Sequence, residues 1–401
     1  MRAETRFAPA LPTAVPPAAI RGAGGAAGAQ AGLSLALLAP EALAPAEQAR
    51  WARLSARSFG GNVFALDWFT GAALAHCRPR FPQVRLAAVR QADGEWLGAL
   101  PIAWGARIGR APIPHWQGWR ATNQFLGGPL VAAGAERTFW QVLLGALDVR
   151  PGAGLALVCE GLAMDDPATL ALLSAAAGDG RRVWIPHRHE RPARHARSAA
   201  QAAADKVSPA LRKARARLAS LERRLAREMG EVRIERHPAE ADPGDWIARF
   251  LALERAGWKG RGGSALACEP CNAALFRDAV REGHRLGLAR LASLSAGGQV
   301  LAMTTWFVSG GQAFGFKMAH DETARRHAPG RLLMRAVAEE LESDPGLPFD
   351  TCNGEGSAPD PFWPDRREVI DCVVAIGSPA RRKTLAGAMA AAALWRELAR
   401  S

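Results

Sequence analysis

The 401-residue sequence contains no tyrosine, although it has 13 tryptophans and 14 phenylalanines. A phenol group is therefore excluded from any chemistry of this chain. Cysteine is scarce, and in a chain of this size the scattered thiols predict no disulfide framework. Cys268 and Cys271 form a C-x-x-C pair, but no second ligand pair follows at a matching spacing, so we expect no metal site. The six cysteines are Cys77, Cys159, Cys268, Cys271, Cys352 and Cys372.

Long apolar runs are also missing. No stretch reaches the roughly 18 uninterrupted apolar residues that a membrane-spanning helix needs. The beginning of the chain lacks the compact apolar segment of a secretory signal peptide. We therefore expect a cytoplasmic protein.

Apolar residues and positive charge are plentiful. Hydrophobic residues make up 49% of the chain and charged residues 22%, which suits two globular units of roughly 150 to 200 residues each. The formal net charge is +13 and the sequence pI is near 10.7. Such a surface attracts nucleic acid, anionic lipid or phosphorylated ligands, and charge alone does not choose among them.

Composition divides the chain into four parts. Residues 1–32 are rich in Ala, Pro and Gly and predict a disordered leader. Residues 33–190 alternate short strands and helices and predict an N-terminal unit. Residues 191–230 are a basic linker and helix, and residues 231–401 predict a C-terminal unit. In the N-terminal unit we expect strands at 33–39, 154–161 and 181–186, a hairpin at 84–105, and helices at 45–59, 135–148 and 166–178.

The basic helix is expected over 208–230. Ser208 suits the N-cap, Pro209 the first helical position and Gly230 the stop. Its apolar residues recur at spacings of 3 and 4, so one face packs and the basic residues face outward. No aromatic residues interleave with the basic ones, which favours a solvated linker helix over a nucleic-acid contact. The packing positions are Leu211, Ala214, Leu218, Leu221 and Leu225.

The C-terminal unit has a distinctive order of elements: a strand, two helices, a three-stranded meander, a helix and a further strand. The expected ranges are 231–237, 245–258, 272–287, 288–319, a helix from 329 and a strand at 347–353. Residues 290–308 also resemble residues 85–104, which indicates a duplicated α/β fold.

The helix after the meander begins in a turn that could hold a phosphate group. Pro329 and Gly330 start the helix, and Gly330 lets a ligand approach the backbone closely. Free N–H groups of a first helical turn bind anions, with the positive end of the helix dipole behind them. Arg325, Arg326 and Arg331 would add charge-assisted contacts. The first unit has no counterpart of this turn.

The order of elements and the motif Arg325-x-x-Ala328-x-Gly330 resemble the Gcn-related N-acetyltransferase (GNAT) superfamily, whose diphosphate loop reads Q/R-x-x-G-x-G/A. A closer resemblance is to the double-GNAT, CelD-type acetyltransferases associated with cellulose and exopolysaccharide production, which are distantly similar to the FemAB peptidyltransferases. It spans most of residues 34–376. The segments that carry it are "KVSPALRKARARLASLERRL", "FLALERAGWKGRGGSAL", "GQVLAMTTWFV", "FKMAHDETARRHAPGRLLM" and "FDTCNGEG".

The resemblance implies two tandem GNAT-like units, each a mostly antiparallel mixed sheet flanked by helices, with acetyl-CoA or another acyl-CoA as cosubstrate in the second. It implies no metal. The coenzyme diphosphate would be bound by the seven residues of the turn, namely Arg325, Arg326, His327, Ala328, Pro329, Gly330 and Arg331. Where the family pattern has its first Gly, this chain has Ala328.

For the catalytic base the resemblance implies Asp350 or Glu355 first and Asp321 next. Many GNAT enzymes protonate the departing thiolate with a tyrosine. In this chain His320, His327, Cys352 or water would have to serve. Trp258 and Lys259 match the family's "WK" and are expected to line the acceptor site.

The expected function is direct transfer of an acyl group to an amine or hydroxyl of a small molecule or of a polysaccharide or cell-envelope precursor. Two alternatives stay open. One is a FemAB-like transferase that uses aminoacyl-tRNA. The other is a basic, non-catalytic adaptor of an exopolysaccharide system. The partners expected are acyl-CoA and an unidentified acceptor, with no specific nucleic acid, and peripheral contact with an anionic membrane is left open.

Overall fold

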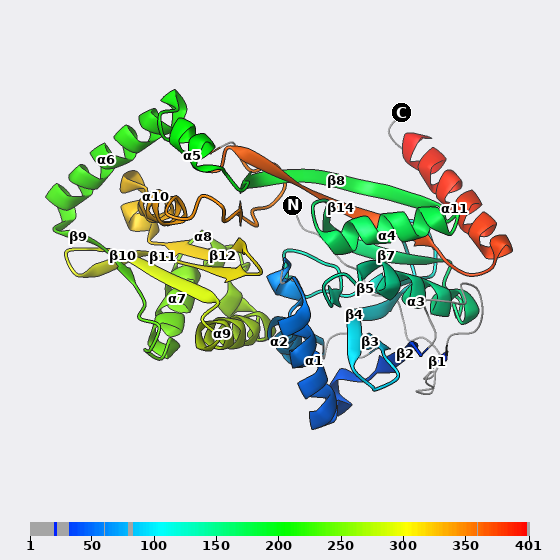
Figure 1. Cartoon of the computed structure of the whole chain (residues 1–401). Coiled ribbons are helices and arrows are strands. Elements are labelled where there is room, and N and C mark those ends of the chain that lie inside the picture. The colour runs from blue at the N-terminus through cyan, green and yellow to red at the C-terminus, as the bar shows by residue number, and fades with distance from the viewer. Residues whose placement is uncertain (1–19, 22–31, 60, 79–82, 359, 399–401) are drawn as a thin grey trace.

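A computed structural model describes residues 20–21, 32–59, 61–78, 83–358 and 360–398 (Figure 1). Most of the predicted leader, 1–32, lies outside this range. Its described residues Ile20–Arg21 form strand β1, which pairs with β2 (Ser34–Leu38). The disorder expected of the leader stays a prediction.

The N-terminal unit follows the predicted alternation and adds the helix α2 (Asp67–Cys77). Trp51 and Leu54 of α1 are buried in its core, whereas Phe59, which was expected in the same helix, lies past the end of α1 and is exposed. The other elements are η1 (Pro40–Ala42), α1 (Pro45–Arg57), η2 (Val63–Ala65), β3 (Arg85–Arg90), β4 (Trp96–Gly105), β5 (His115–Gly118), β6 (Leu130–Val131), α3 (Glu136–Val149), β7 (Ala156–Ala163), α4 (Pro167–Gly178) and β8 (Val183–Arg194).

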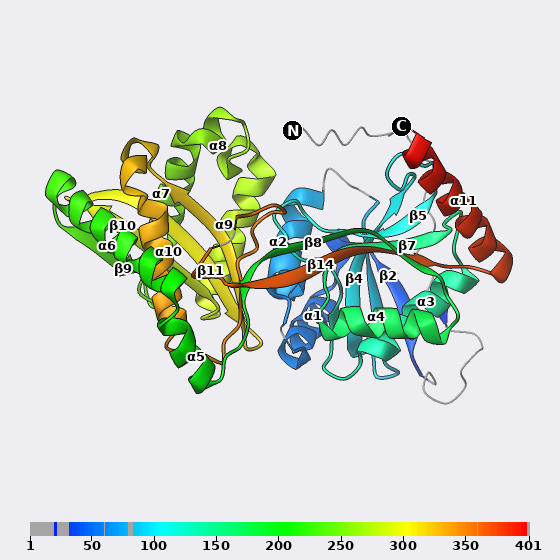
Figure 2. The same ribbon diagram turned by 90° about the horizontal axis from the view of Figure 1, so that it is seen from above.

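The C-terminal unit is a sheet with helices on both faces. Figures 1 and 2 show α6 and α10 on one face of β10 to β12 and α7 and α9 on the other. The elements are α5 (Ala199–Lys206), α6 (Pro209–Met229), β9 (Val232–Arg236), α7 (Gly244–Ala256), α8 (Trp258–Arg261), η4 (Leu266–Cys268), α9 (Pro270–Arg285), β10 (Ala289–Ala296), β11 (Gln299–Ser309), β12 (Gln312–His320), η5 (Glu322–His327), α10 (Pro329–Leu341) and β13 (Phe349–Asp350).

Helix α6 follows its sequence signals except at the N-cap. Pro209 begins the helix and Gly230 ends it with φ = 98°, whereas the side chain of Ser208 makes no capping hydrogen bond. Leu211, Leu218 and Leu225 are buried, so the predicted apolar stripe packs and most arginines point outward.

The described strands form one 14-stranded sheet in the order β1-β2-β3-β4-β5-β7-β14-β8-β13-β12-β11-β10-β9, with β6 beside β4. Neighbours are antiparallel except for the parallel pairs β5 with β7 and β12 with β13. This mixed, mostly antiparallel sheet flanked by helices confirms the predicted fold class. None of the helices in the described part of the chain is long and apolar enough to cross a membrane.

The C-terminal strand β14 (Asp365–Ala375) lies in the sheet of the N-terminal unit. It pairs with β7 and with β8, and the two long strands run side by side in Figure 2. Ile370 and Val373 are buried in the N-terminal cores, and α11 (Pro379–Leu398) places Leu385 in the same region. β14 belongs by sequence to the predicted C-terminal unit, 231–401, but it pairs with strands of the N-terminal unit and buries its apolar side chains there.

Candidate active site

The site is built where β12 and β13 stop pairing. The two strands are parallel partners only at Ala313 with Phe349 and Phe314 with Asp350, after which β13 ends and β12 continues to His320. Gly315 is needed at this point, since a Cβ on it would lie 2.6 Å from the carbonyl oxygen of Thr351. Beyond Phe314, no described strand pairs with β12 on the side where β13 lies.

A bulge in β12 lies next to this divergence. Thr305 of β11 pairs with Lys317 and Trp306 pairs with Gly315, so Phe316 has no opposite residue in β11. A bulge re-aims the side chains that follow it and takes backbone groups out of the regular ladder. Backbone N–H groups at such a position can stabilise a developing oxyanion.

The turn before α10 has the backbone conformation that explains the family pattern. Ala328 is the N-cap residue and has φ = 49° and ψ = 52°, in the left-handed region that favours glycine. Its carbonyl oxygen accepts hydrogen bonds from the N–H groups of Arg331 and Leu332. Position 328 is where the pattern has Gly, and the alanine at this position is strained because its backbone is left-handed.

Gly330 is buried beside β12. A Cβ there would lie 3.4 Å from Met318 Sδ and 3.5 Å from His320 Nδ1. Pro329 is buried as well. The small residues therefore bring the start of α10 against β12.

The charged residues of the turn are already partly paired. Arg326 Nη2 lies 2.6 Å from Glu228 Oε2, and the buried His327 lies 3.2 Å from the same oxygen through Nε2. Glu228 comes from the C-terminal end of α6, and its hydrogen bond from Arg224 lowers the pKa of its carboxyl most strongly. Arg331 lies 3.6 Å from Asp360. Arg325 is exposed.

Asp321 is occupied in capping η5. Its Oδ1 accepts hydrogen bonds from the N–H and Oγ1 of Thr323, and its Oδ2 accepts one from Gln299. These bonds explain why the chain turns after β12. The arrangement suits a structural role for Asp321 better than the predicted role as a base. His320, the last residue of β12, is half-buried beside Gly330.

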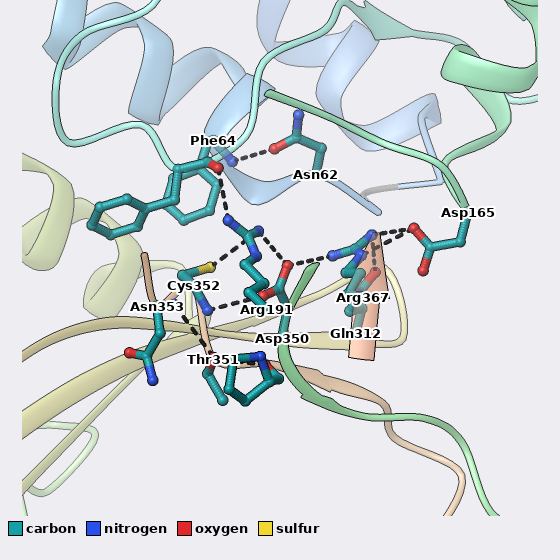
Figure 3. Close-up of polar contacts among 12 residues, drawn as sticks. Asn62, Phe64, Asp165, Arg191, Gln312, Asp350, Thr351, Cys352, Asn353 and Arg367 are labelled. Carbon is teal, nitrogen blue, oxygen red and sulfur yellow. Dashed lines mark hydrogen bonds and ion pairs between the residues drawn. The ribbon is translucent and has the colours of Figure 1, made fainter. Parts of the chain in front are cut away.

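Asp350 lies in a fully buried ion network (Figure 3). Its Oδ2 accepts hydrogen bonds from Arg191 at 2.5 Å and Arg367 at 2.8 Å, and its Oδ1 accepts one from the N–H of Cys352 at 2.9 Å. Burial raises the pKa of Asp350, but the two guanidinium groups outweigh it and hold the pKa below the usual value. Arg367 also donates two hydrogen bonds to Asp165.

This environment does not suit the general-base role predicted for Asp350. Both of its oxygens are occupied, the side chain is 0% exposed, and a lowered pKa weakens it as a proton acceptor. The carboxylate of Asp350 instead links β13 to two other strands, because Arg191 lies on β8 and Arg367 on β14. Cys352 is buried in the left-handed region with φ = 53°, and burial raises the pKa of its thiol, which makes it a poor proton donor.

Glu355 is the exposed carboxylate of the predicted set. Its side chain is 64% exposed and lies 3.2 Å from His187 Nε2 on β8. The structure therefore separates Glu355, which solvent reaches, from the buried Asp350. A pair of this kind contributes little to stability because water screens it.

Trp258 and Lys259, which were expected to line the acceptor site, contact residues at the end of β12 and in η5. The indole of Trp258 is exposed, and its backbone N–H donates to Glu322 of η5 at 2.7 Å. Lys259 Nζ donates to Glu254 at 2.8 Å and to the carbonyl oxygen of Met318 at 3.3 Å. These contacts hold α8 against the end of β12.

Lys317 was missed by the sequence analysis. It is a half-buried lysine on β12, one residue past the bulge, and it donates a hydrogen bond to Asn123 Oδ1 at 2.6 Å. The signal that could have found it is a cation within the otherwise apolar strand "GQAFGFKMA". Burial lowers the pKa of Lys317 to about 8.

The structure offers little for a metal. Within its described residues, no cluster of three or more His, Cys, Asp or Glu side chains is arranged to hold an ion.

A cavity of about 50 Å³ lies away from this site, in the N-terminal unit, and is lined in part by Asn62, Glu136 and Asp166. It is far too small for a coenzyme, since one water molecule alone needs roughly 10–15 Å³ of such space.

Residues 212–355 match the family model of the acetyltransferase (GNAT) domain. This segment contains β9 to β13, the turn, Trp258 and Lys259, and it supports an enzyme of the acyltransferase class. No curated protein matches the sequence.

Three solved structures are similar to the chain. A conserved protein of unknown function from Bacteroides thetaiotaomicron has a TM-score of 0.51 at 12% identity, over 82% of this chain and 97% of that one. FemX has a TM-score of 0.50 at 11% identity, over 82% and 96%. The C-terminal domain of a candidate lysylphosphatidylglycerol synthetase from Agrobacterium fabrum has a TM-score of 0.50 at 14% identity, over 86% and 97%. At these identities the likeness is one of fold.

Proposed function

We propose that this chain, whose residues 212–355 match the acetyltransferase (GNAT) domain, transfers an acyl group from acyl-CoA to an amine or hydroxyl. The observation that carries the proposal is that strand β12 lies next to two features that an acyl-CoA would use. β12 diverges from β13 after Phe314, and the same strand leads into the arginine-bearing turn at the start of α10. A thioester at the divergence and a diphosphate at the turn would use both.

The residues proposed to bind the diphosphate are those of the turn from Arg325 to Arg331. Arg326 and Arg331 have exposed guanidinium groups, and Gly330 supplies a first-turn N–H at the positive end of α10. Arg325 is exposed beside them. Trp258 and Lys259 would line the approach of the acceptor from the α8 side.

The acceptor is proposed to be a small molecule or a polysaccharide or cell-envelope precursor, in keeping with the resemblance to CelD-type enzymes. A cytoplasmic location belongs to the same proposal. The test is release of CoA thiol from acetyl-CoA by the purified full chain, with glucosamine, serine, lysine and ethanolamine offered as acceptors. Thiol release that depends on an acceptor supports the proposal, and coenzyme binding without turnover would favour the non-catalytic adaptor.

One observation favours a second candidate, an aminoacyl-tRNA-dependent transferase. Helix α6 exposes a run of basic side chains, a surface that attracts a polyanion. The exposed residues are Arg212, Lys213, Arg217, Arg223, Arg224 and Arg227. Salt-dependent binding of charged tRNA, together with no melting-temperature shift by any acyl-CoA, would favour this candidate over acyl-CoA transfer.

A further inference from the structure

Lys317 lies on β12 close to the point where β12 and β13 diverge. It follows the bulge at Phe316 and lies two residues beyond Gly315, which touches the carbonyl oxygen of Thr351 at the divergence of β12 and β13. The next residue, Met318, packs toward Gly330 of α10. The Lys317 amine lies toward the other face of the sheet, near Lys259 and Glu254, away from the turn proposed for the diphosphate.

Aromatic rings and a neutral amide surround the Lys317 amine, and none of these groups carries a negative charge that would stabilise the protonated form. Its Nζ lies 4.8 Å from the ring centroid of Phe125 and 5.9 Å from that of Phe316, and its hydrogen bond goes to the neutral amide of Asn123. In the described part of the chain it makes no ion pair, because the nearby carboxylate of Glu254 is paired with Lys259.

The charged and titratable groups that face Lys317 act in both directions. Burial lowers the pKa of Lys317 most strongly, to about 8, and the ammonium of Lys259 lowers it further, while Glu254 and Cys352 oppose them. At pH 7 a lysine with a pKa of about 8 is free amine in roughly one molecule in ten, whereas an exposed lysine with a pKa of about 10.4 is free amine in fewer than about one in a thousand.

We propose that the Lys317 amine is the proton-transfer group of this site, an assignment that rests on the acyl-CoA transfer proposed above. The neutral Nζ takes the proton from the acceptor as its nitrogen or oxygen bonds to the thioester carbonyl carbon. The C–S bond then breaks, and the ammonium returns the proton to the thiolate, which leaves as CoA thiol. Lys317 ends neutral, and a chain without tyrosine needs no other acid.

The experiment uses the full chain, acetyl-CoA and the four acceptors named above. Wild-type kcat/KM should rise with pH along a limb centred near 8. Lys317→Met and Lys317→Arg should each lose about 100-fold or more in kcat, since removal of an acid-base group costs roughly 10²–10⁴. Both should keep the acetyl-CoA melting-temperature shift, which shows that they fold. Lys383→Met on the exposed face of α11 is the control and should behave as wild type.

A second variant tests the environment of the amine. Asn123→Asp places a carboxylate against Nζ and should move the pH limb upward by about one unit or more, since a nearby opposite charge favours the charged form. Two results would overturn the assignment of Lys317: turnover by Lys317→Met within threefold of wild type, or a kcat/KM pH limb that Asn123→Asp does not move. In either case, a melting-temperature shift by acetyl-CoA would still support acyl-CoA binding. No thiol release from wild type with any acceptor would instead sink the proposed function and this assignment with it.

Discussion

Arg191 and Asp350 form an ion pair, with 2.5 Å between Nη2 and Oδ2, that joins the two units of the chain. Arg191 lies on β8, the strand that leaves the N-terminal unit, and Asp350 ends β13 beside the proposed site. Arg367 of β14 completes the network. The carboxylate therefore fixes the end of β13, where the backbone must leave β12.

Asp350→Asn should lower the free energy of unfolding by about 3–5 kcal/mol, because removing one partner leaves buried charges uncompensated. Urea denaturation at neutral pH measures this. Glu355→Gln, which removes an exposed carboxylate paired with His187, is the matched control and should change stability by less than about 1 kcal/mol. A loss of under about 1 kcal/mol for Asp350→Asn would contradict the structural role of the network.

The same carboxylate predicts a dependence on pH. The folded state holds the pKa of Asp350 below its usual value, so its stabilisation is fully present above the unfolded pKa of about 3.9. It is lost as the pH falls from there through the folded-state pKa. The stability difference between wild type and Asp350→Asn should therefore shrink below about pH 4. Denaturation curves collected down the acid range check this, and a difference that stays constant would refute it.

Ala328→Gly should raise the free energy of unfolding by about 1 kcal/mol. The alanine sits at φ = 49°, where a Cβ is strained and glycine is not. Ala336→Gly, the same chemical change within α10, should instead cost about 1 kcal/mol through lost helix propensity. Denaturation of both variants measures the contrast, and two losses of equal size would show that residue 328 is not strained.

Glu228→Gln should tighten coenzyme binding. Glu228 holds Arg326 at 2.6 Å and places a negative charge beside the turn where the diphosphate is proposed to lie. Its removal frees the guanidinium, and we expect the Kd for acetyl-CoA to fall about three- to tenfold by calorimetry. Glu222→Gln is the control on the same helix, since Glu222 pairs with Arg335. Weaker binding to Glu228→Gln would mean that Glu228 supports the turn rather than competing for it.

Local sequence signals predicted the elements around the site, while long-range partners escaped them. Pro329 and Gly330 predict the start of α10, and its apolar residues Leu333, Val337 and Leu341, which recur every four positions, are buried. The sequence analysis predicted no strand at 365–375. The place of β14 between β7 and β8 could not be predicted either, because pairing across some 200 residues leaves no mark in local periodicity.

For the residues of the site too, the sequence indicated their local positions but not their long-range partners. The sequence placed Asp350 inside an expected strand at 347–353, but its guanidinium partners 159 and 17 residues away could not be read from it. These partners hold as a buried ion the carboxylate that was expected to act as a base. Lys317 is visible as a cation in an apolar strand, yet its lowered pKa depends on burial against Phe125 from the other unit.

Coenzyme binding at the turn before α10 is the central claim, and a thermal-shift measurement with CoA and acetyl-CoA tests it most directly. The melting temperature of wild type should rise with ligand concentration, as binding to the folded state alone requires. Arg326→Glu should remove that shift, whereas Arg217→Glu on the exposed face of α6 should keep it. A wild-type melting temperature that no acyl-CoA changes would contradict the account.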